Sequence, residues 1–247
     1  MSNIAGLVSI SFRDRTPEEI VKYTALAGLD GIEWGGDVHS PHGDISAANK
    51  IRALTEQNKL TIPEYGSYYK IATSEPELFD GVLASAKALG TKIIRVWAGS
   101  KASDCFKNDE YAAAVADAKR ICALAGDITV ALECHPKTLT DDYYTALAFI
   151  HDVDMPNLKM FWQPNQYRPL EYNLEAIKAL LPYIVSVHVF SWVRNDKYPL
   201  AYGESSWKKY IELLSAKELN YMLEFMHDGN IETLAETARV LREWLNK

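Results

Sequence analysis

The chain has 247 residues, 48% of them hydrophobic, and a formal net charge of −7. This length is usual for one barrel-sized domain and can bury a large core without disulfides. The acidic balance gives no support to a nucleic-acid-binding protein, and no apolar run approaches the roughly 18 residues of a membrane span.

The cysteines and the N-terminus indicate a cytoplasmic protein. Cys105, Cys122 and Cys134 are odd in number and have no CxxC spacing, which favours reduced thiols over a disulfide framework. The first residues lack a basic start followed by an apolar segment, so we expect no signal peptide.

Short apolar runs alternate with helical patterns from one end of the chain to the other. The first strand is predicted at 4–10, and Thr16, Pro17 and Glu19 mark the start of a helix that Gly28 ends. The later strands are predicted at 31–34, 60–66, 92–97, 130–133, 159–162, 184–190 and 221–223. The later helices are predicted at 45–57, 75–89, 110–124, 141–151, 174–181, 205–214 (with Ser205 or Ser206 as its cap) and 232–245.

This alternation predicts the fold class. Eight strand-then-helix units indicate an α/β protein with a parallel sheet. Eight such units in one chain of this length favour a closed (β/α)₈ TIM barrel, so we expect residues 1–247 to form a single domain. No glycine-rich phosphate-binding sequence follows the first strand, where an open dinucleotide-binding fold would need it.

Four consecutive predicted strands end in a side chain that can bind a metal. These side chains are Glu133, Gln163, His188 and Glu224. Because the carboxyl ends of parallel strands meet at one rim of a barrel, we expect the four to converge there. Two carboxylates, an imidazole and an amide oxygen suit one divalent ion, Mn²⁺ or Mg²⁺ before Co²⁺ or Zn²⁺.

The two carboxylates also suggest a reaction. A metal that binds a ketose carbonyl and the neighbouring hydroxyl acidifies the C–H bond between them and stabilises the enediolate. Glu133 and Glu224 leave the barrel three strands apart, so they can flank a substrate. One would remove a proton and the other return one, as general base and general acid.

The sequence resembles the sugar isomerase/epimerase superfamily of xylose-isomerase-like barrels over nearly its whole length. The resemblance rests on four segments, 31–34, 132–135, 187–189 and 223–225. It implies that Glu133, the residue at 163, His188 and Glu224 bind one divalent metal, and that the two glutamates transfer protons. It also implies that Arg194, six residues after His188, contacts the substrate.

Two positions depart from the family pattern. The residue at the end of the sixth strand is usually Asp and here is Gln163, and the His that commonly follows three residues later is Gln166. Gln163 removes one negative charge from the ligand set, so metal affinity should fall and the Lewis acidity of the ion should rise. The change weakens the case for a ketose 3-epimerase of the common type, and a relative with another substrate or one that has lost its metal fits the sequence equally well.

Aromatic and histidine side chains near the other strand ends are candidates for the substrate pocket, because pockets combine apolar walls with a few polar groups. The candidates are His39, Tyr65, Tyr68, Trp97, His135 and Trp162. Cys134 follows Glu133 directly and therefore should point into the layer between barrel and helices, which argues against a nucleophile.

The leading hypothesis is a metal-dependent isomerase or epimerase of a small carbohydrate, whether a ketose, a keto acid or a sugar phosphate. A dehydratase of a keto-sugar or inosose would use the same enolate step. An abasic-site endonuclease shares the fold, but such an enzyme carries a three-metal cluster with His and Asp ligands at nearly every strand end. This sequence offers only one set of metal ligands. A non-catalytic sugar-binding barrel is the fourth hypothesis, motivated by Gln163. The sequence leaves the oligomeric state open, including a homo-oligomer.

Overall fold

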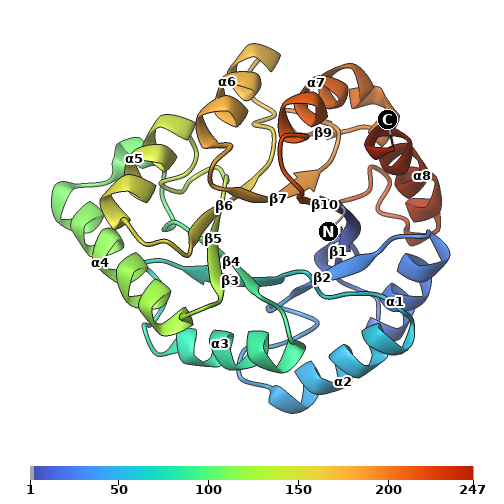
Figure 1. Ribbon diagram of the computed structural model, residues 1–247, viewed down its shortest axis with the longest axis horizontal. Coiled ribbons are helices and arrows are strands. Elements are labelled where there is room, and N and C mark those ends of the chain that lie inside the picture. Colours follow the sequence, from blue (N-terminus) through green and yellow to red (C-terminus); the bar gives the residue numbers. More distant parts are fainter. Residues whose placement is uncertain (1–2, 247) are drawn as a thin grey trace.

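A computed structural model describes residues 3–246 and shows a closed barrel surrounded by helices (Figure 1). The parallel strands follow the order β1-β10-β7-β6-β5-β4-β3-β2 around the barrel. They are β1 (Ile4–Val8), β2 (Gly31–Gly35), β3 (Tyr65–Lys70), β4 (Ile93–Trp97), β5 (Thr129–Glu133), β6 (Leu158–Trp162), β7 (Ile184–Val189) and β10 (Asn220–Leu223). The predicted (β/α)₈ TIM barrel is therefore confirmed.

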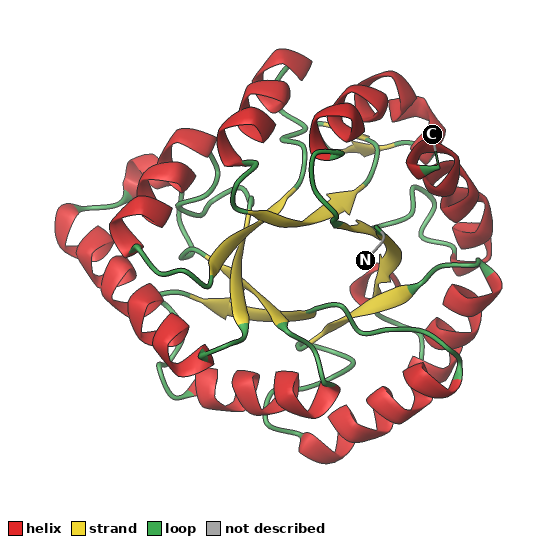
Figure 2. Ribbon diagram, viewed as in Figure 1, coloured by secondary structure: helices red, strands yellow, loops and turns green. Residues whose placement is uncertain are grey.

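One long helix follows each barrel strand and packs outside it, as Figure 2 shows. These helices are α1 (Pro17–Leu26), α2 (Ile45–Gln57), α3 (Leu78–Leu89), α4 (Asn108–Ala125), α5 (Tyr143–Val153), α6 (Leu170–Leu180), α7 (Glu204–Leu214) and α8 (Leu234–Leu245). Thr16 caps α1 with Glu19 in the predicted capping box. Between residues 3 and 246, no helix is long and apolar enough to cross a membrane.

The third strand lies later than predicted, over Tyr65–Lys70 rather than 60–66. Pro63 cannot donate to a sheet ladder, and before it only Thr61 makes an isolated bridge, to Gly31. Beyond Gly66 the register with β4 shifts, so that Lys70 rather than Tyr68 lies opposite Trp97. Tyr68 adopts a left-handed conformation with φ of 56°, which accommodates this bulge.

Two features after the seventh strand also differ from the prediction. The cap of α7 is Gly203 and not Ser205 or Ser206, because a 3₁₀ turn (Leu200–Gly203) runs directly into the helix. A small hairpin of β8 (Trp192–Val193) and β9 (Asp196–Lys197) precedes this turn. Its strands are too short to give a pattern in the sequence.

The apolar core and the charged side chains occupy different layers. Between the strands and the helices the core is apolar, with large buried side chains such as Trp34, Trp162 and Trp207. Side chains that point into the barrel include buried ionisable groups, because alternate residues of a strand face opposite sides. These groups are Glu33, Glu64, Arg95, Glu133, His188 and Glu224.

Candidate metal centre and active site

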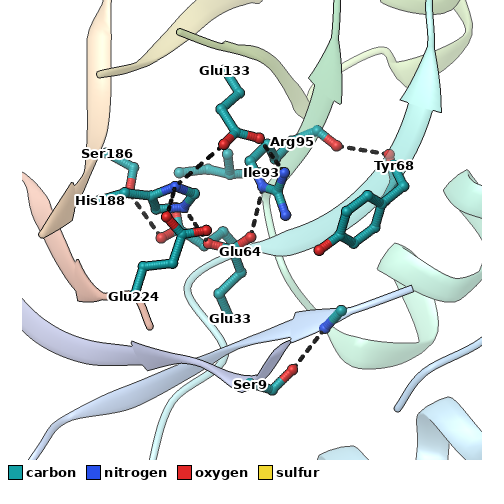
Figure 3. Close-up of polar contacts among 12 residues, drawn as sticks. Ser9, Glu33, Glu64, Tyr68, Ile93, Arg95, Glu133, Ser186, His188 and Glu224 are labelled. Carbon is teal, nitrogen blue, oxygen red and sulfur yellow. Dashed lines mark hydrogen bonds and ion pairs between the residues drawn. The ribbon is translucent and has the colours of Figure 1, made fainter. Parts of the chain in front are cut away.

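The structure brings the four predicted ligands together around one edge of His188. Figure 3 shows Glu133, His188 and Glu224 of this set. From His188 Nδ1, Gln163 Oε1 lies at 3.2 Å, Glu224 Oε2 at 3.6 Å and Glu133 Oε1 at 3.7 Å. The ligand atoms of Glu133, His188 and Glu224 all lie within 4.8 Å of one another. Side chains that leave four different strands therefore form one compact set of potential donors.

The opposite edge of His188 is held by a carboxylate. His188 Nε2 lies 2.9 Å from Glu33 Oε2, and both side chains are fully buried. A hydrogen on Nε2 donated to Glu33 leaves Nδ1 directed at Gln163 and the two other glutamates. A carboxylate behind an imidazole is the usual way to fix the orientation of a metal-binding histidine.

The two oxygens of Glu133 have different surroundings. Its Oε2 accepts hydrogen bonds from Arg95 Nη1 and from Trp97 Nε1, the latter at 2.6 Å, while Oε1 faces His188. Burial alone would raise the pKa of Glu133, but the charge of Arg95 and the contact with His188 outweigh it and lower the pKa. Glu133 is therefore held as a carboxylate with one oxygen free for a ligand or a substrate.

Glu224 has the opposite electrostatic character. Burial raises its pKa to about 7, and repulsion from Glu133 and Glu33 adds to this, against the attraction of His188 and Arg95. Within residues 3–246 no side chain donates a hydrogen bond to its carboxylate, and His188 Nδ1 lies 3.6 Å from its Oε2. One glutamate of the pair is thus fixed in its ionised form, and the other gains and loses a proton near neutral pH.

Sequence reasoning missed three charged residues that support this cluster. Arg95 donates from Nε to Glu33 Oε1 at 2.8 Å, so its guanidinium bridges Glu33 and Glu133 (Figure 3). Glu64 lies next to the cluster, where its carboxyl group accepts hydrogen bonds from Ser186 Oγ at 2.8 Å and Asn220 Nδ2 at 3.4 Å. Burial, with repulsion from Glu33, raises the pKa of Glu64 to about 8, so it is mostly protonated at pH 7.

The charges of the cluster fit a divalent cation. In the metal-free cluster the neighbouring carboxylates raise the pKa of His188. Once His188 is neutral and Glu224 ionised, as metal ligands must be, and with Glu64 protonated, Glu33, Glu133 and Glu224 carry three negative charges and Arg95 carries one positive charge. The remaining two negative charges are costly inside a barrel unless a cation compensates them. One divalent ion among Glu133, His188, Glu224 and Gln163 would make the buried set neutral.

Three of the predicted pocket residues lie beside the ligand cluster. Trp97 bonds to Glu133 and stacks on the imidazole of His135, with ring centroids 4.3 Å apart. His135 Nδ1 donates to the carbonyl of Pro136 at 2.7 Å. Tyr68 packs edge-on against Trp97 and under the guanidinium of Arg95. These aromatic rings are placed to form one wall of a pocket.

Three other candidates are buried in structural positions, and their role in substrate binding stays a prediction. Trp162 is buried between β6 and α7 against Trp207, because it alternates with the inward-facing Gln163. Tyr65 is fully buried outside the barrel and donates to the carbonyl of Ser40.

His39 is also buried in a structural position, with its ring nitrogens bonded to Ser9 Oγ and the carbonyl of Arg15. Arg194 is exposed at the turn of the β8–β9 hairpin, where its backbone N–H donates to the carbonyl of Gln166. Within residues 3–246 its guanidinium makes no hydrogen bond or ion pair with the ligand cluster, so its role as a substrate contact stays a prediction. Cys134 is half-buried, and burial raises its thiol pKa to about 12, as expected for a structural cysteine.

Comparison with known proteins identifies the family. Residues 21–245 match the family described as xylose isomerase-like TIM barrel. The chain belongs to this family. It is also 30% identical over 166 residues to a 3-dehydroshikimate dehydratase of Bacillus anthracis, a match that covers 63% of this chain and 59% of that relative. The match thus spans less than two thirds of the curated relative.

Several solved structures share the fold over almost the whole chain. A probable 3-DHS dehydratase from Bacillus anthracis is 24% identical, with 98% of this chain and 99% of that one covered and a TM-score of 0.81. A D-psicose 3-epimerase from Clostridium cellulolyticum H10 is 14% identical, with 98% of both chains covered and a TM-score of 0.77. A Mycobacterium smegmatis protein of this type, solved in complex with magnesium, is 15% identical, with 99% of this chain and 98% of that one covered and a TM-score of 0.77.

Proposed function

We propose that this protein is a divalent-metal-dependent enzyme that removes a proton next to the carbonyl group of a small carbohydrate. The observation that carries the proposal is the pairing of a fixed carboxylate, Glu133, with a protonatable one, Glu224, around His188. Glu133, Gln163, His188 and Glu224 would hold the cation, with Mn²⁺ or Mg²⁺ preferred by the oxygen-rich set. When bound, such an ion polarises the carbonyl of the substrate.

The two glutamates divide the proton transfers. A group whose pKa lies near the working pH is the more effective acid–base catalyst. In the metal-free cluster burial raises the pKa of Glu224 to about 7, whereas Arg95 holds Glu133 ionised, so we assign removal of the proton from the carbon beside the carbonyl to Glu224. Glu133, oriented by Arg95 and Trp97, presents its Oε1 on the other side of the resulting enediolate. Return of a proton to the neighbouring carbon or to the other face completes an isomerisation or an epimerisation.

Dehydration is the second candidate, favoured by the 30% identical relative that is a 3-dehydroshikimate dehydratase. The C–H bond breaks first, as in epimerisation, and its electron pair then forms a C=C bond while the C–O bond of a β-hydroxyl breaks. The proton held by Glu224 passes to the departing hydroxyl group and releases water. The same residues therefore support both outcomes, and the substrate decides between them.

Assay of the Mn²⁺-loaded protein on ketoses, keto acids, inososes and 3-dehydroshikimate tests the proposal. We expect either exchange of one carbon-bound hydrogen for deuterium in D₂O, which marks isomerisation or epimerisation, or loss of water, which gives an aromatic ultraviolet absorbance from 3-dehydroshikimate. Purified protein should also retain about one Mn²⁺ per chain, since one ligand set is present. Absence of Mn²⁺ binding, together with no exchange or water loss on any compound, would contradict the proposal and favour a sugar-binding barrel.

A further inference from the structure

Two groups of aromatic rings flank the ligand cluster, one beside each proposed acid–base glutamate. On the β4–β5 side, Trp97 bonds to Glu133 and contacts the rings of Tyr68 and His135. On the β10 side, Phe225 directly follows Glu224 and packs against Trp192, with ring centroids 5.8 Å apart. The mouth of the site therefore has an aromatic wall next to each carboxylate.

A lysine ammonium lies over each of these walls. Lys70 Nζ lies 5.2 Å from the centre of the Trp97 ring. Lys197 Nζ lies 4.8 Å from the centre of the Phe225 ring and 5.0 Å from that of Trp192. The site thus has a cation on both sides of its opening.

Neither lysine has an ion-pair partner among residues 3–246, whereas nearby cations at this end of the barrel do. Arg13 pairs with Asp37, and Lys101 pairs with Glu110. A carboxylate partner would neutralise the ammonium, but an aromatic face only positions it and leaves its charge available. Lys70 and Lys197 are therefore held in place without being neutralised.

The position of Lys70 is fixed by its backbone. The register shift in β3 places Lys70 level with Trp97. Its N–H donates to Ser74 Oγ at 2.9 Å, and its carbonyl accepts from the N–H groups of Thr73 and Ser74 in the turn that follows. The side chain is half-buried, so its unpaired charge is less screened than that of a fully exposed lysine.

We propose that the substrate of this site carries a negatively charged group, a carboxylate or a phosphate, and that the ammonium of Lys70 binds it. This inference rests on the proposed function, because it places that group beside the carbon from which the glutamates remove a proton. The chain as a whole has a net charge of −7 and would repel an anion. With a divalent cation the buried cluster is neutral, so the two unpaired lysines set the local potential at the opening.

Titration calorimetry on the Mn²⁺-loaded full chain tests this inference with two pairs of probes. One pair is 3-dehydroshikimate and its neutral methyl ester, and the other is D-ribulose 5-phosphate and D-ribulose. The variants are Lys70→Gln, which removes the charge, and Lys70→Arg, which retains it. Lys50→Gln is the matched control, because Lys50 is an exposed lysine on α2 away from the strand ends.

We expect the wild type to bind the charged member of at least one pair about tenfold or more tightly than its neutral partner. Lys70→Gln should reduce this preference to nearly one, while Lys70→Arg and Lys50→Gln should preserve it. The pair that shows the preference identifies a carboxylate or a phosphate. No preference in either pair, or an unchanged preference in Lys70→Gln, would overturn the inference. Turnover of neutral ketoses without such a preference would leave the proposed function standing and refute only the anionic substrate.

Discussion

The two halves of the barrel contribute different things to the site. Strands β5, β6, β7 and β10 present the four proposed ligands at or just beyond their last residues. Strands β2 and β4 contribute no ligand, but Glu33 and Arg95 lie inside the barrel and hold His188 and Glu133. The comparison shows that the chemistry is placed on one half while the other half sets the orientation and charge of the groups that perform it.

Substitution of the acid–base pair should produce the largest effect. Glu224→Gln and Glu133→Gln each keep the shape of the side chain and remove a proton-transfer group, so we expect turnover to fall about 10²–10⁴-fold with the fold intact. Steady-state kinetics on the substrate found in the assays, with circular dichroism to verify folding, measures this. Glu18→Gln on the exposed surface of α1 is the control. A variant with near wild-type kcat would remove that glutamate from the mechanism.

The contribution of β2 and β4, the strands that orient the ligands, can be tested through Arg95. Arg95→Met leaves Glu33 and Glu133 buried without their shared cation, and the loss of one partner of a buried ion pair costs about 3–5 kcal/mol of unfolding free energy. Urea unfolding of the metal-free protein measures the loss. Arg95→Lys keeps the charge but loses the guanidinium that reaches both carboxylates, so its stability should lie between those of the wild type and Arg95→Met. A stable Arg95→Met variant would show that the carboxylates do not depend on the guanidinium.

Glu64 should make stability depend on pH. Burial raises its pKa from 4.5 to about 8, so between these values the folded protein retains a proton that the unfolded chain releases. The contribution of Glu64 to stability is therefore fully present below pH 4.5 and is lost as the pH rises towards 8, by about 1.4 kcal/mol per unit. Glu64→Gln should become more stable relative to the wild type over this range.

The measurement for Glu64 is urea unfolding of the wild type and Glu64→Gln, both without metal, at pH 5, 6, 7 and 8. The difference between the two proteins cancels the titration of groups that they share. A difference that stays constant with pH would show that Glu64 ionises normally in the folded protein.

The smallest effect is expected for Gln163. An amide oxygen binds a hard cation through a dipole and a carboxylate through a full charge, so Gln163→Asp should tighten Mn²⁺ binding, by about tenfold or 1.4 kcal/mol. Asp is one methylene shorter, which can reduce the gain. Calorimetric titration of both proteins, with circular dichroism as a folding check, decides. Unchanged affinity in a folded variant would place Gln163 outside the ligand set.

The sequence predicted the ligands on β5, β6, β7 and β10 better than the residues on β2 and β4 that hold them in place. Glu133 and His188 end apolar runs. Because the carboxyl ends of barrel strands lie at one rim, residues at these ends are expected to lie close together. Glu33 and Arg95 lie within strands. The sequence gives no role to a charged residue inside an apolar strand until its partners on other strands are known. Their pairing across the barrel depends on register, which the pattern of one strand does not contain.

The positions of Tyr65 and Trp162 have a simpler origin. Tyr65 and Trp162 are near strand ends, but each directly neighbours an inward-facing residue and therefore faces the helices. Alternation along the strand is enough to place both side chains outside the barrel once Glu64 and Gln163 are known to point inwards. The bulge at Tyr68, in contrast, could not be predicted, because a left-handed tyrosine has no signature in the sequence.

The contact between His188 and Glu33 joins β7 to β2, two strands on different sides of the closed sheet. A cation on Nδ1 would fix the hydrogen of the imidazole on Nε2 and strengthen its bond to Glu33. The dynamics of a strand that donates no ligand should then report on occupancy of the site: amide hydrogen exchange in β2 should slow when Mn²⁺ is added. Helix α5, for which the described residues show no hydrogen bond to β2 or to the ligand cluster, should exchange at the same rate with and without the ion.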